Sequence, residues 1–335
     1  MTIENPVFII GCPRSGTTLL YNILSEAPEL WSIGTESKHI IEQHHHPREK
    51  NWESGELTAA DVTTVSRTTI PQAFRQQAAP GTFWQKINRA RGWLRRQKSW
   101  RQLKQRGRTT QSGASVSSAI PQAGMDRLRQ LVTLRNQWLP GQPDAIRLLE
   151  KTPENCLRLP FLLELFPDGR IIYLIRDGRD NINSLLNGWR EPHLFPGYPV
   201  PDPLHIPGYQ RPRWAFSLIP GWRDLVDRPL AEICARQWIA CNEAVLTFQQ
   251  QSSVPILTIR LEELVAQPAA TLPHIADFLQ IENRESLMRH GAQLPQINVT
   301  SRPTEAKWQQ NEAEIRAILP FIQPMMAQLG YESSV

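Results

Sequence analysis

The residues best suited to chemistry lie in a glycine-rich segment near the start of the chain. Gly11 and Gly16 bracket four residues, which is the spacing of a loop that surrounds a phosphate with backbone N–H groups. The residues of this segment that add a cation or a hydroxyl are Arg14, Ser15, Thr17 and Thr18. A helix that begins at Thr17 would add partial positive charge at the same point. The segment therefore predicts a binding site for a phosphate-like anion.

One departure from the usual phosphate loop narrows the ligand. The loop of a nucleoside triphosphatase carries Lys, then Ser or Thr, after its second glycine. In this chain Thr17 occupies the Lys position, and the cation, Arg14, lies inside the loop. The pattern therefore argues against hydrolysis of ATP or GTP. The alternative interpretation is a plain connection between a strand and a helix, because glycine-rich turns also serve that purpose.

The elements that must position these residues alternate between strand and helix. Short apolar runs predict strands at 7–10, 30–33, 147–150, 170–175 and 254–261. Helices are predicted over 17–27, 155–165, 181–187, 230–250, 264–279 and 312–329. This alternation favours a parallel sheet covered by helices on both faces, a P-loop-like three-layer αβα fold. Ligands of such sheets bind outside the carboxyl ends of the strands, where Arg14, Glu36, Lys151 and Arg176 would lie.

Composition and charge narrow the class of protein. The chain has 335 residues, 40% of them hydrophobic, and we expect a single α/β domain over 1–335. Its net charge of +5 suits an anionic ligand without requiring nucleic acid. The four cysteines form no CxxC pair, and we find neither a secretory signal nor a run of 18 apolar residues. We therefore expect a cytoplasmic protein.

A run of three histidines, His44 to His46, is the one sequence feature that suggests a metal. Adjacent residues on a loop rarely converge on one ion, and no partner ligand stands at a useful spacing. We therefore interpret the run as a solvated loop and predict no metal site.

Two segments interrupt the regular alternation. Residues 54–140 are predicted as a mostly helical, basic insertion, in which 86–108 holds ten Lys and Arg residues and no acid, with tryptophans interleaved. The basic stretch either meets an anionic surface, in a peripheral membrane contact, or is a solvated helix. Residues 191–221 are rich in Pro, Gly and aromatic residues. They are interpreted as a loop that shapes a substrate pocket, or alternatively as a packed surface loop.

Several short motifs follow one another in an order that resembles the sulfotransferase family, closest to its tyrosylprotein and Golgi-type branch. The matching segments are 13–18, 34–36, 151–153, 166–167, 176–179 with Ser184, Trp238 with Asn242, 262–268, 307–308 and 329–331. Each motif is weak alone, but their order and spacing make the set specific. The resemblance covers the first 40 residues and most of 147–331, whereas the insertion does not participate.

The resemblance implies a sulfuryl donor, 3′-phosphoadenosine 5′-phosphosulfate (PAPS), whose product is 3′-phosphoadenosine 5′-phosphate (PAP), and no metal. The residues that would hold the 5′-phosphosulfate are Arg14, Ser15, Gly16, Thr17 and Thr18. Arg176 and Ser184 would hold the 3′-phosphate, unless Arg176 instead forms a salt bridge with Asp177 or Asp180. Lys307 would close over the phosphosulfate, and Ser301 is a further candidate in the same late loop.

The resemblance also implies catalytic roles. Glu36 would be the general base that takes the proton of the acceptor, although it could be an ordinary loop carboxylate. Arg14 and Lys151 would stabilise charge on the transferring sulfuryl group and the bridging oxygen. Fixed cations would thereby take the role of a metal.

The expected acceptor is a hydroxyl on a small molecule, lipid or glycan, because the chain lacks the signal anchor that Golgi enzymes carry. No specific nucleic acid is expected as a partner. One alternative is a nucleotide kinase of related fold, which Thr17 argues against. The other is a non-enzymatic polyanion-binding protein that uses 86–108, and it would show strongly salt-dependent binding to nucleic acid.

Overall fold

A central, mostly parallel sheet organises the protein in the computed structural model, which describes residues 2–87, 130–134, 136, 143–191, 195, 197–292, 294 and 307–331. Its strands are β1 (Thr2–Ile3), β2 (Val7–Ile10), β3 (Leu30–Ser32), β4 (Ala79–Pro80), β5 (Ala145–Lys151), β6 (Arg170–Ile175) and β7 (Ile256–Arg260). Their order is β4-β3-β5-β2-β6-β7, and β1 also pairs with β5. Only the β3–β4 pair among these described strands is antiparallel.

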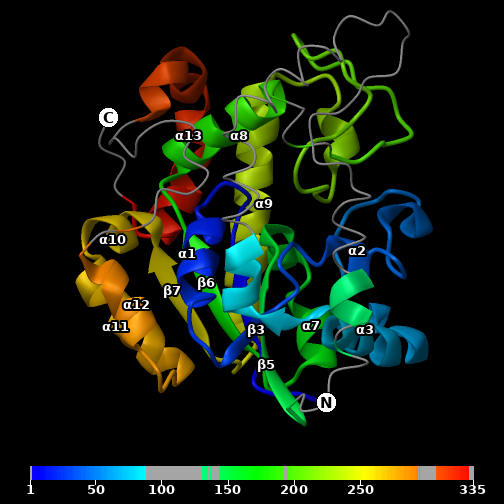
Figure 1. Ribbon diagram of the computed structural model, residues 1–335. Helices are drawn as coiled ribbons and strands as arrows, with labels where there is room; N and C mark the ends of the chain where they lie inside the picture. Colours follow the sequence, from blue (N-terminus) through cyan, green and yellow to red (C-terminus); the bar gives the residue numbers. More distant parts are fainter. Residues whose placement is uncertain are drawn as a thin grey trace, which may run out of the picture.

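Helices cover both faces of this sheet (Figure 1). The longer ones are α1 (Thr17–Leu24), α3 (Thr64–Gln77), α7 (Leu159–Leu165), α8 (Gly178–Arg190), α9 (Leu230–Gln251), α11 (Pro268–Leu279) and α13 (Glu312–Gln328). The shorter ones are α2 (Lys38–Ile41), α10 (Leu261–Ala266) and α12 (Glu285–Met288). Single turns of 3₁₀-helix lie at Pro47–Lys50, Ala59–Asp61, Pro153–Leu157, Trp222–Leu225, Arg289–Gly291 and Lys307–Asn311.

The central strand β2 shows how the two faces are buried. Val7 and Ile9 pack in the hydrophobic cluster that contains residues of α1 and α11, whereas Phe8 and Ile10 pack in the cluster of α7 and α9. All four side chains are inaccessible to solvent. A strand covered on both faces is expected to be a continuous apolar run, which β2 is. The predicted three-layer αβα arrangement is therefore confirmed.

The parallel register brings the carboxyl ends of the strands to one edge. Ile9 of β2 is opposite Lys151 of β5, and Ile10 is opposite Tyr173 of β6. The loop that begins at Gly11, the end of β5 and the end of β6 are consequently neighbours. This edge is where the sequence predicted the ligand.

The described part of the predicted insertion contributes to the sheet as well as to the helical layer. Ile70 and Phe74 of α3 are fully buried in the core, and β4 pairs antiparallel with β3. The insertion was predicted to be mostly helical, and that prediction did not include the edge strand β4. A two-residue strand gives no periodic signal, and its pairing depends on β3, which is remote in sequence. Of the basic stretch 86–108, all but Lys86 and Ile87 lies outside the described residues.

Prolines explain where two predicted helices differ from the structure. The predicted helix at 264–279 is divided into α10 and α11, and Pro268 stands in the first turn of α11. The predicted helix at 155–165 starts as the 3₁₀ turn Pro153–Leu157 and continues as α7, which has Pro160 in its first turn. Proline lacks the N–H that would continue a preceding helix but fits the first turn of a new one.

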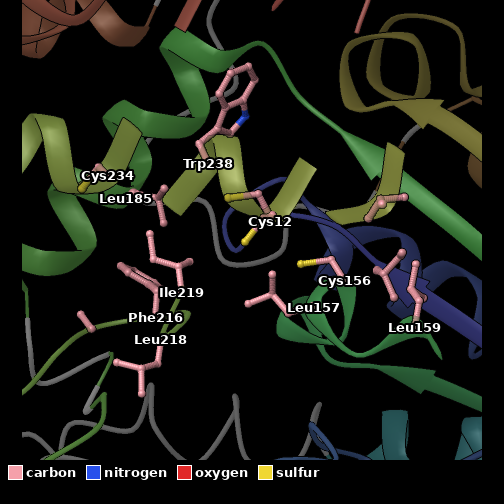
Figure 2. Packing of buried hydrophobic residues seen from close by; sticks show 14 of the residues in the cluster. Cys12, Cys156, Leu157, Leu159, Leu185, Phe216, Leu218, Ile219, Cys234 and Trp238 are labelled. Carbon is pink, nitrogen blue, oxygen red and sulfur yellow. The ribbon is translucent and has the colours of Figure 1, made fainter. Parts of the chain in front are cut away.

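Part of the loop 191–221 packs into the core, whereas several of its prolines and arginines are exposed. Tyr198 and Trp214 pair as an isolated bridge, and both side chains are buried. Figure 2 shows Phe216, Leu218 and Ile219 grouped together in the same core as Leu185 of α8. These contacts fit a packed loop, and the role of the loop in shaping a substrate pocket stays a prediction.

The histidine run is half-buried, so it is less solvated than predicted. The ring of His45 lies against Phe161, and the ring of His46 lies against Trp52. His46 Nδ1 also accepts a hydrogen bond from the N–H of Arg48. Trp52 is only six residues from His46, whereas Phe161 comes from a remote part of the chain. No helix within the described residues is long and apolar enough to cross a membrane.

A buried guanidinium ties α2, the loop 191–221 and the 3₁₀ turn at 153–157 together. Arg158, only 1% exposed, donates to Gly55 O at 2.9 Å and to Glu42 Oε1 at 2.8 Å. Tyr198 donates its hydroxyl to the same Glu42 oxygen. Replacing Arg158 with Met is expected to lower the free energy of unfolding by about 3–5 kcal/mol, because Glu42 would remain buried without its cation. Urea denaturation measures this loss.

A surface pair provides the matched control for that prediction. Arg67 and Glu164 are 2.6 Å apart, but their side chains are 53% and 43% exposed. Arg67→Met is expected to change the free energy of unfolding by less than about 1 kcal/mol, since water screens this pair. If both variants lose the same free energy of unfolding, burial does not explain the effect of Arg158→Met.

Candidate active site

The loop between β2 and α1 has the backbone shape of an anion cradle. Gly16 has φ 97° and forms the N-cap of α1, and Arg14 has φ 76°. Gly11 allows a close approach, because a Cβ there would lie 2.3 Å from Leu174 O. The first N–H groups of α1 have no acceptor inside the helix. The loop therefore presents donors where an anion can accept them.

An unsatisfied hydroxyl points to the same conclusion. Ser15 is 1% exposed, and its Oγ has no hydrogen-bond partner among the described residues. A Cβ on Gly11 would come within 2.7 Å of this oxygen, so the hydroxyl lies inside the loop. A buried hydroxyl without a partner is costly unless a ligand satisfies it. The loop thus fits a phosphate or phosphosulfate group.

Two arginines from different elements meet beside this loop. Arg14 Nε donates to Ser184 Oγ of α8 at 3.1 Å, and Arg176 Nη1 donates to Arg14 O at 3.2 Å. Burial and the charge of Arg176 both lower the pKa of Arg14. The predicted 5′-phosphosulfate loop thus lies next to Ser184 and Arg176, the residues predicted for the 3′-phosphate. Because the two positive charges repel each other, an anion that accepts from both would be favoured here.

The predicted alternative for Arg176 is also present. Arg176 Nη2 lies 3.7 Å from Asp180 Oδ2, one turn along α8. The pKa of Asp180 is raised by burial, against the opposing effects of Arg176, the Trp308 N–H and Lys307. The negative charge of Asp180 therefore offsets only part of the positive charge of Arg176 and Lys307.

Lys307 reaches the same cluster from the far end of the chain. Burial and the charge of Arg176 lower the pKa of Lys307, and Asp180 opposes them. Its carbonyl accepts from Asn183 Nδ2 at 3.0 Å, which attaches the turn Lys307–Asn311 to α8. Ser301 lies outside the described residues. The sequence thus identified one residue of the late loop that the structure places near Arg176.

Glu36 and Lys151 form an ion pair at the ends of neighbouring strands. Lys151 Nζ lies 2.6 Å from Glu36 Oε1, and the two side chains are 9% and 41% exposed. Lys151 ends β5 and Glu36 follows β3 by a few residues. Because β3 and β5 are parallel neighbours, their carboxyl ends deliver the two side chains to one place.

Sequence reasoning missed three residues that shape this region. The ring of Phe195 lies 4.9 Å from the guanidinium of Arg14. Asn181 Nδ2 donates to Pro13 O at 2.9 Å and so holds the loop against α8. Glu150 is a buried carboxylate that directly precedes Lys151. Of these three residues, only Glu150 could have been found from the sequence, because it is next to Lys151, a predicted catalytic residue. The contacts of Phe195 and Asn181 depend on tertiary packing.

Cysteines and possible metal ligands are the remaining chemical groups of this region. Cys12 lies in the loop, and Figure 2 shows it in the buried core near Cys156 and Trp238. Burial raises the pKa of Cys12, so its thiol is protonated at neutral pH and is a poor nucleophile. Among the described residues, no group of three or more His, Cys, Asp or Glu side chains could hold a metal ion.

Known proteins match this chain along most of its length. Protein-tyrosine sulfotransferase A from Caenorhabditis elegans is 25% identical over 345 aligned positions, which cover 97% of this chain and 67% of that protein. Protein-tyrosine sulfotransferase 1 from Danio rerio is 22% identical over 209 positions, which cover 57% of this chain and 50% of that protein. The crystal structure of sulfotransferase STF9 from Mycobacterium avium aligns with a TM-score of 0.49 at 16% identity, over 99% of this chain and 78% of that one.

The family assignment comes from a match at the level of the whole family. Residues 6–193 match the Sulfotransferase family, and they include the anion loop, Glu36, Lys151 and Arg176. This range is more than half of the chain. The chain therefore belongs to the sulfotransferase family.

Proposed function

We propose that this protein transfers the sulfuryl group of PAPS to a hydroxyl of an acceptor. The observation that carries the proposal is the Glu36–Lys151 ion pair, at the sheet edge that also holds Arg14 and Arg176. A carboxylate beside a cation can take a proton while the cation stabilises negative charge nearby. Sulfuryl transfer needs both functions within reach of an anion site.

The proposed donor site consists of residues whose contacts suit two anionic groups. Ser15, Arg14 and the N–H groups at the start of α1 are proposed to bind the 5′-phosphosulfate, because Ser15 Oγ is buried without a partner among the described residues. Arg176 and Ser184 are proposed to bind the 3′-phosphate, with Lys307 beside them. PAPS supplies the sulfuryl group, and PAP departs.

The proposed roles of Glu36 and Lys151 follow from their positions. Glu36 takes the proton of the acceptor hydroxyl as the new bond from that oxygen to sulfur forms. The bond from sulfur to the bridging oxygen of the phosphate breaks, and this oxygen gains negative charge. Lys151 and Arg14 stabilise that charge with fixed cations, which need little reorganisation. The proton ends on Glu36, and the electron pair of the broken bond ends on PAP.

The acceptor is proposed from chemistry and from the named relatives. Both curated relatives are named for protein tyrosine, which is a phenol. A single carboxylate base can serve a phenol or an alcohol, so we propose a hydroxyl of a small molecule, lipid, glycan or tyrosyl residue. Transfer from radiolabelled PAPS to a panel with one member of each class identifies the acceptor.

Calorimetry with PAP tests the donor site directly. PAP is expected to bind the wild-type protein, and Arg176→Ala and Arg14→Ala are each expected to weaken binding about 10-fold to 100-fold. The reason is that a hydrogen bond to a charged group contributes about 1.5–3 kcal/mol. ATP with Mg²⁺ is expected not to bind, since Thr17 stands in the Lys position of the loop.

An exposed arginine on the same helix serves as the control for lost charge. Arg190 lies on α8 and pairs with Glu314 at the surface. Arg190→Ala is expected to bind PAP as tightly as the wild type. If the wild type fails to bind PAP, or if ATP binds in its place, the proposed function is wrong.

A further inference from the structure

A chain of buried hydrogen bonds lies directly beneath the Glu36–Lys151 pair. Glu150, which is 1% exposed, accepts from Thr152 Oγ1 at 2.5 Å and from Asn155 Nδ2 at 2.9 Å. Thr152 Oγ1 in turn accepts from the N–H of Ser37 at 2.8 Å. Ser37, Thr152 and Asn155 are all inaccessible to solvent. We call Glu150, Thr152, Asn155 and Ser37 the buried clamp.

The carboxylate sets the direction of every hydrogen bond in the buried clamp. An ionised carboxylate only accepts, whereas a hydroxyl has one proton to donate. The Thr152 hydroxyl donates its one proton to Glu150. Its oxygen can then only accept, and it accepts from the Ser37 N–H. The Ser37 hydroxyl, 3.1 Å from Thr152 Oγ1, is therefore the donor in any hydrogen bond between these two oxygens. The carboxylate thus fixes the polarity of the bonds between Thr152 and Ser37.

The buried clamp joins the two segments that carry the reactive pair. Ser37 follows Glu36 in the chain, and Thr152 follows Lys151. The bonds between Ser37 and Thr152 therefore fix the distance between the two peptides that present Glu36 Oε1 and Lys151 Nζ. Glu36 itself is 41% exposed, so little packing holds its side chain directly. Its position depends on the backbone next to it.

Burying a carboxylate here needs a reason beyond stability. Burial raises the pKa of Glu150, and the hydrogen bonds of the clamp together with the charge of Lys151 oppose that rise. Apolar residues of similar size are often as good as, or better than, a buried charged group for stability. Buried polar networks do, however, favour one local arrangement, and in this one both Glu150 oxygens accept hydrogen bonds, whereas Asn155 Oδ1 has no partner among the described residues.

We propose that Glu150 is a positioning residue, which aligns Glu36 with Lys151 through Thr152 and Ser37. It does so without touching donor or acceptor. This inference rests on the proposed function. A displacement of a reacting group by about 1 Å can cost about 10²-fold in rate. The buried clamp is the set of contacts that prevents such a displacement.

Substitutions at Thr152 separate positioning from bulk packing. Thr152→Val keeps the shape and removes the hydroxyl, and it is expected to lower kcat by about 10²-fold with the Kd for PAP unchanged. Thr152→Ser keeps the hydroxyl and is expected to retain the kcat of the wild type. Glu150→Gln replaces one of the two accepting carboxylate oxygens with an NH2 group, which only donates. It is therefore also expected to lower kcat by about 10²-fold with the Kd for PAP unchanged. A kcat for Thr152→Val equal to that of the wild type would overturn the proposal, as would a parallel loss of PAP binding.

Tyr173→Phe controls for the loss of any buried hydrogen bond. Its hydroxyl donates to Asn242 of α9 in the core, and neither residue belongs to the buried clamp. This variant is expected to lose stability and to keep the wild-type kcat. If kcat falls equally in Tyr173→Phe and Thr152→Val, the effect is general destabilisation and the positioning role is refuted.

A measurement without substrate keeps the positioning role testable if the protein proves not to bind PAP. A double-mutant cycle of Glu36→Gln and Lys151→Met, read by urea unfolding, gives the coupling free energy of the pair. This coupling is expected to be present in the wild type and in Thr152→Ser, and to fall toward zero in Glu150→Gln. An unchanged coupling in Glu150→Gln contradicts the clamp, whatever the outcome for PAP. If the wild-type protein does not bind PAP, only the proposed function is contradicted.

Discussion

Glu36→Gln is expected to lower kcat by about 10²–10⁴-fold, which is the range for loss of a general base. The amide keeps the size of the carboxylate and can still accept from Lys151, which lies 2.6 Å from Glu36 Oε1 in the wild type. It cannot take a proton at neutral pH. Steady-state transfer of radiolabelled sulfuryl groups measures kcat, and calorimetry with PAP is expected to show an unchanged Kd. A large loss of kcat with intact donor binding is the result expected when the base is lost and the donor site is unchanged.

Glu164→Gln is the control for this substitution. Glu164 is an exposed acid that also pairs with a cation, Arg67, but it lies on α7 outside the candidate active site. Its kcat is expected to equal that of the wild type. If Glu36→Gln retains the wild-type kcat, Glu36 is an ordinary loop carboxylate and the proton must go elsewhere.

Lys151→Met is expected to lower kcat by about 10²–10³-fold, since it removes a fixed charge from the place where negative charge develops. Met keeps the length and the apolar contacts of a side chain that is only 9% exposed. An interaction that strengthens only in the transition state lowers kcat and kcat/KM together when it is removed. Measuring both constants for PAPS distinguishes this result from a loss of ground-state binding.

Lys50→Met gives the comparison for a lost lysine. Lys50 pairs with Asp61 at 2.6 Å and is 39% exposed, and it lies outside the proposed donor site. Its kinetic constants are expected to match those of the wild type. A higher KM with unchanged kcat in Lys151→Met would mean that Lys151 binds the donor uniformly and does not act on the transfer step.

Local patterns in the sequence were enough to predict the parallel sheet and its functional edge. The apolar runs at Val7–Ile10 and Arg170–Ile175 became β2 and β6 with the predicted bounds. The glycine spacing at 11–16 predicted a loop that the structure forms with Gly16 as the N-cap of α1. These features depend on residues that are close in sequence, so periodicity and turn chemistry are sufficient to identify them.

The roles of Glu36, Lys151 and Arg176 came from the order of motifs, and they stay predictions until the substitutions above are made. The role of Lys307 has the same origin and is also a prediction. The sequence expected these side chains at one edge because parallel strands end together. The structure places Glu36 against Lys151 and Arg176 against Arg14. It does not describe Ser301, so that prediction stays open.

The sequence by itself determined the fold class, the anion loop and the family resemblance, because each depends on short segments with a characteristic spacing. Only the tertiary structure decided the pairing of β4 with β3, the bond from Arg14 to Ser184, and the buried clamp beneath Glu36. Each of these joins residues that are far apart in the chain. Their geometry depends on how whole elements pack, and the hydrophobic core that fixes this packing comes from all layers at once.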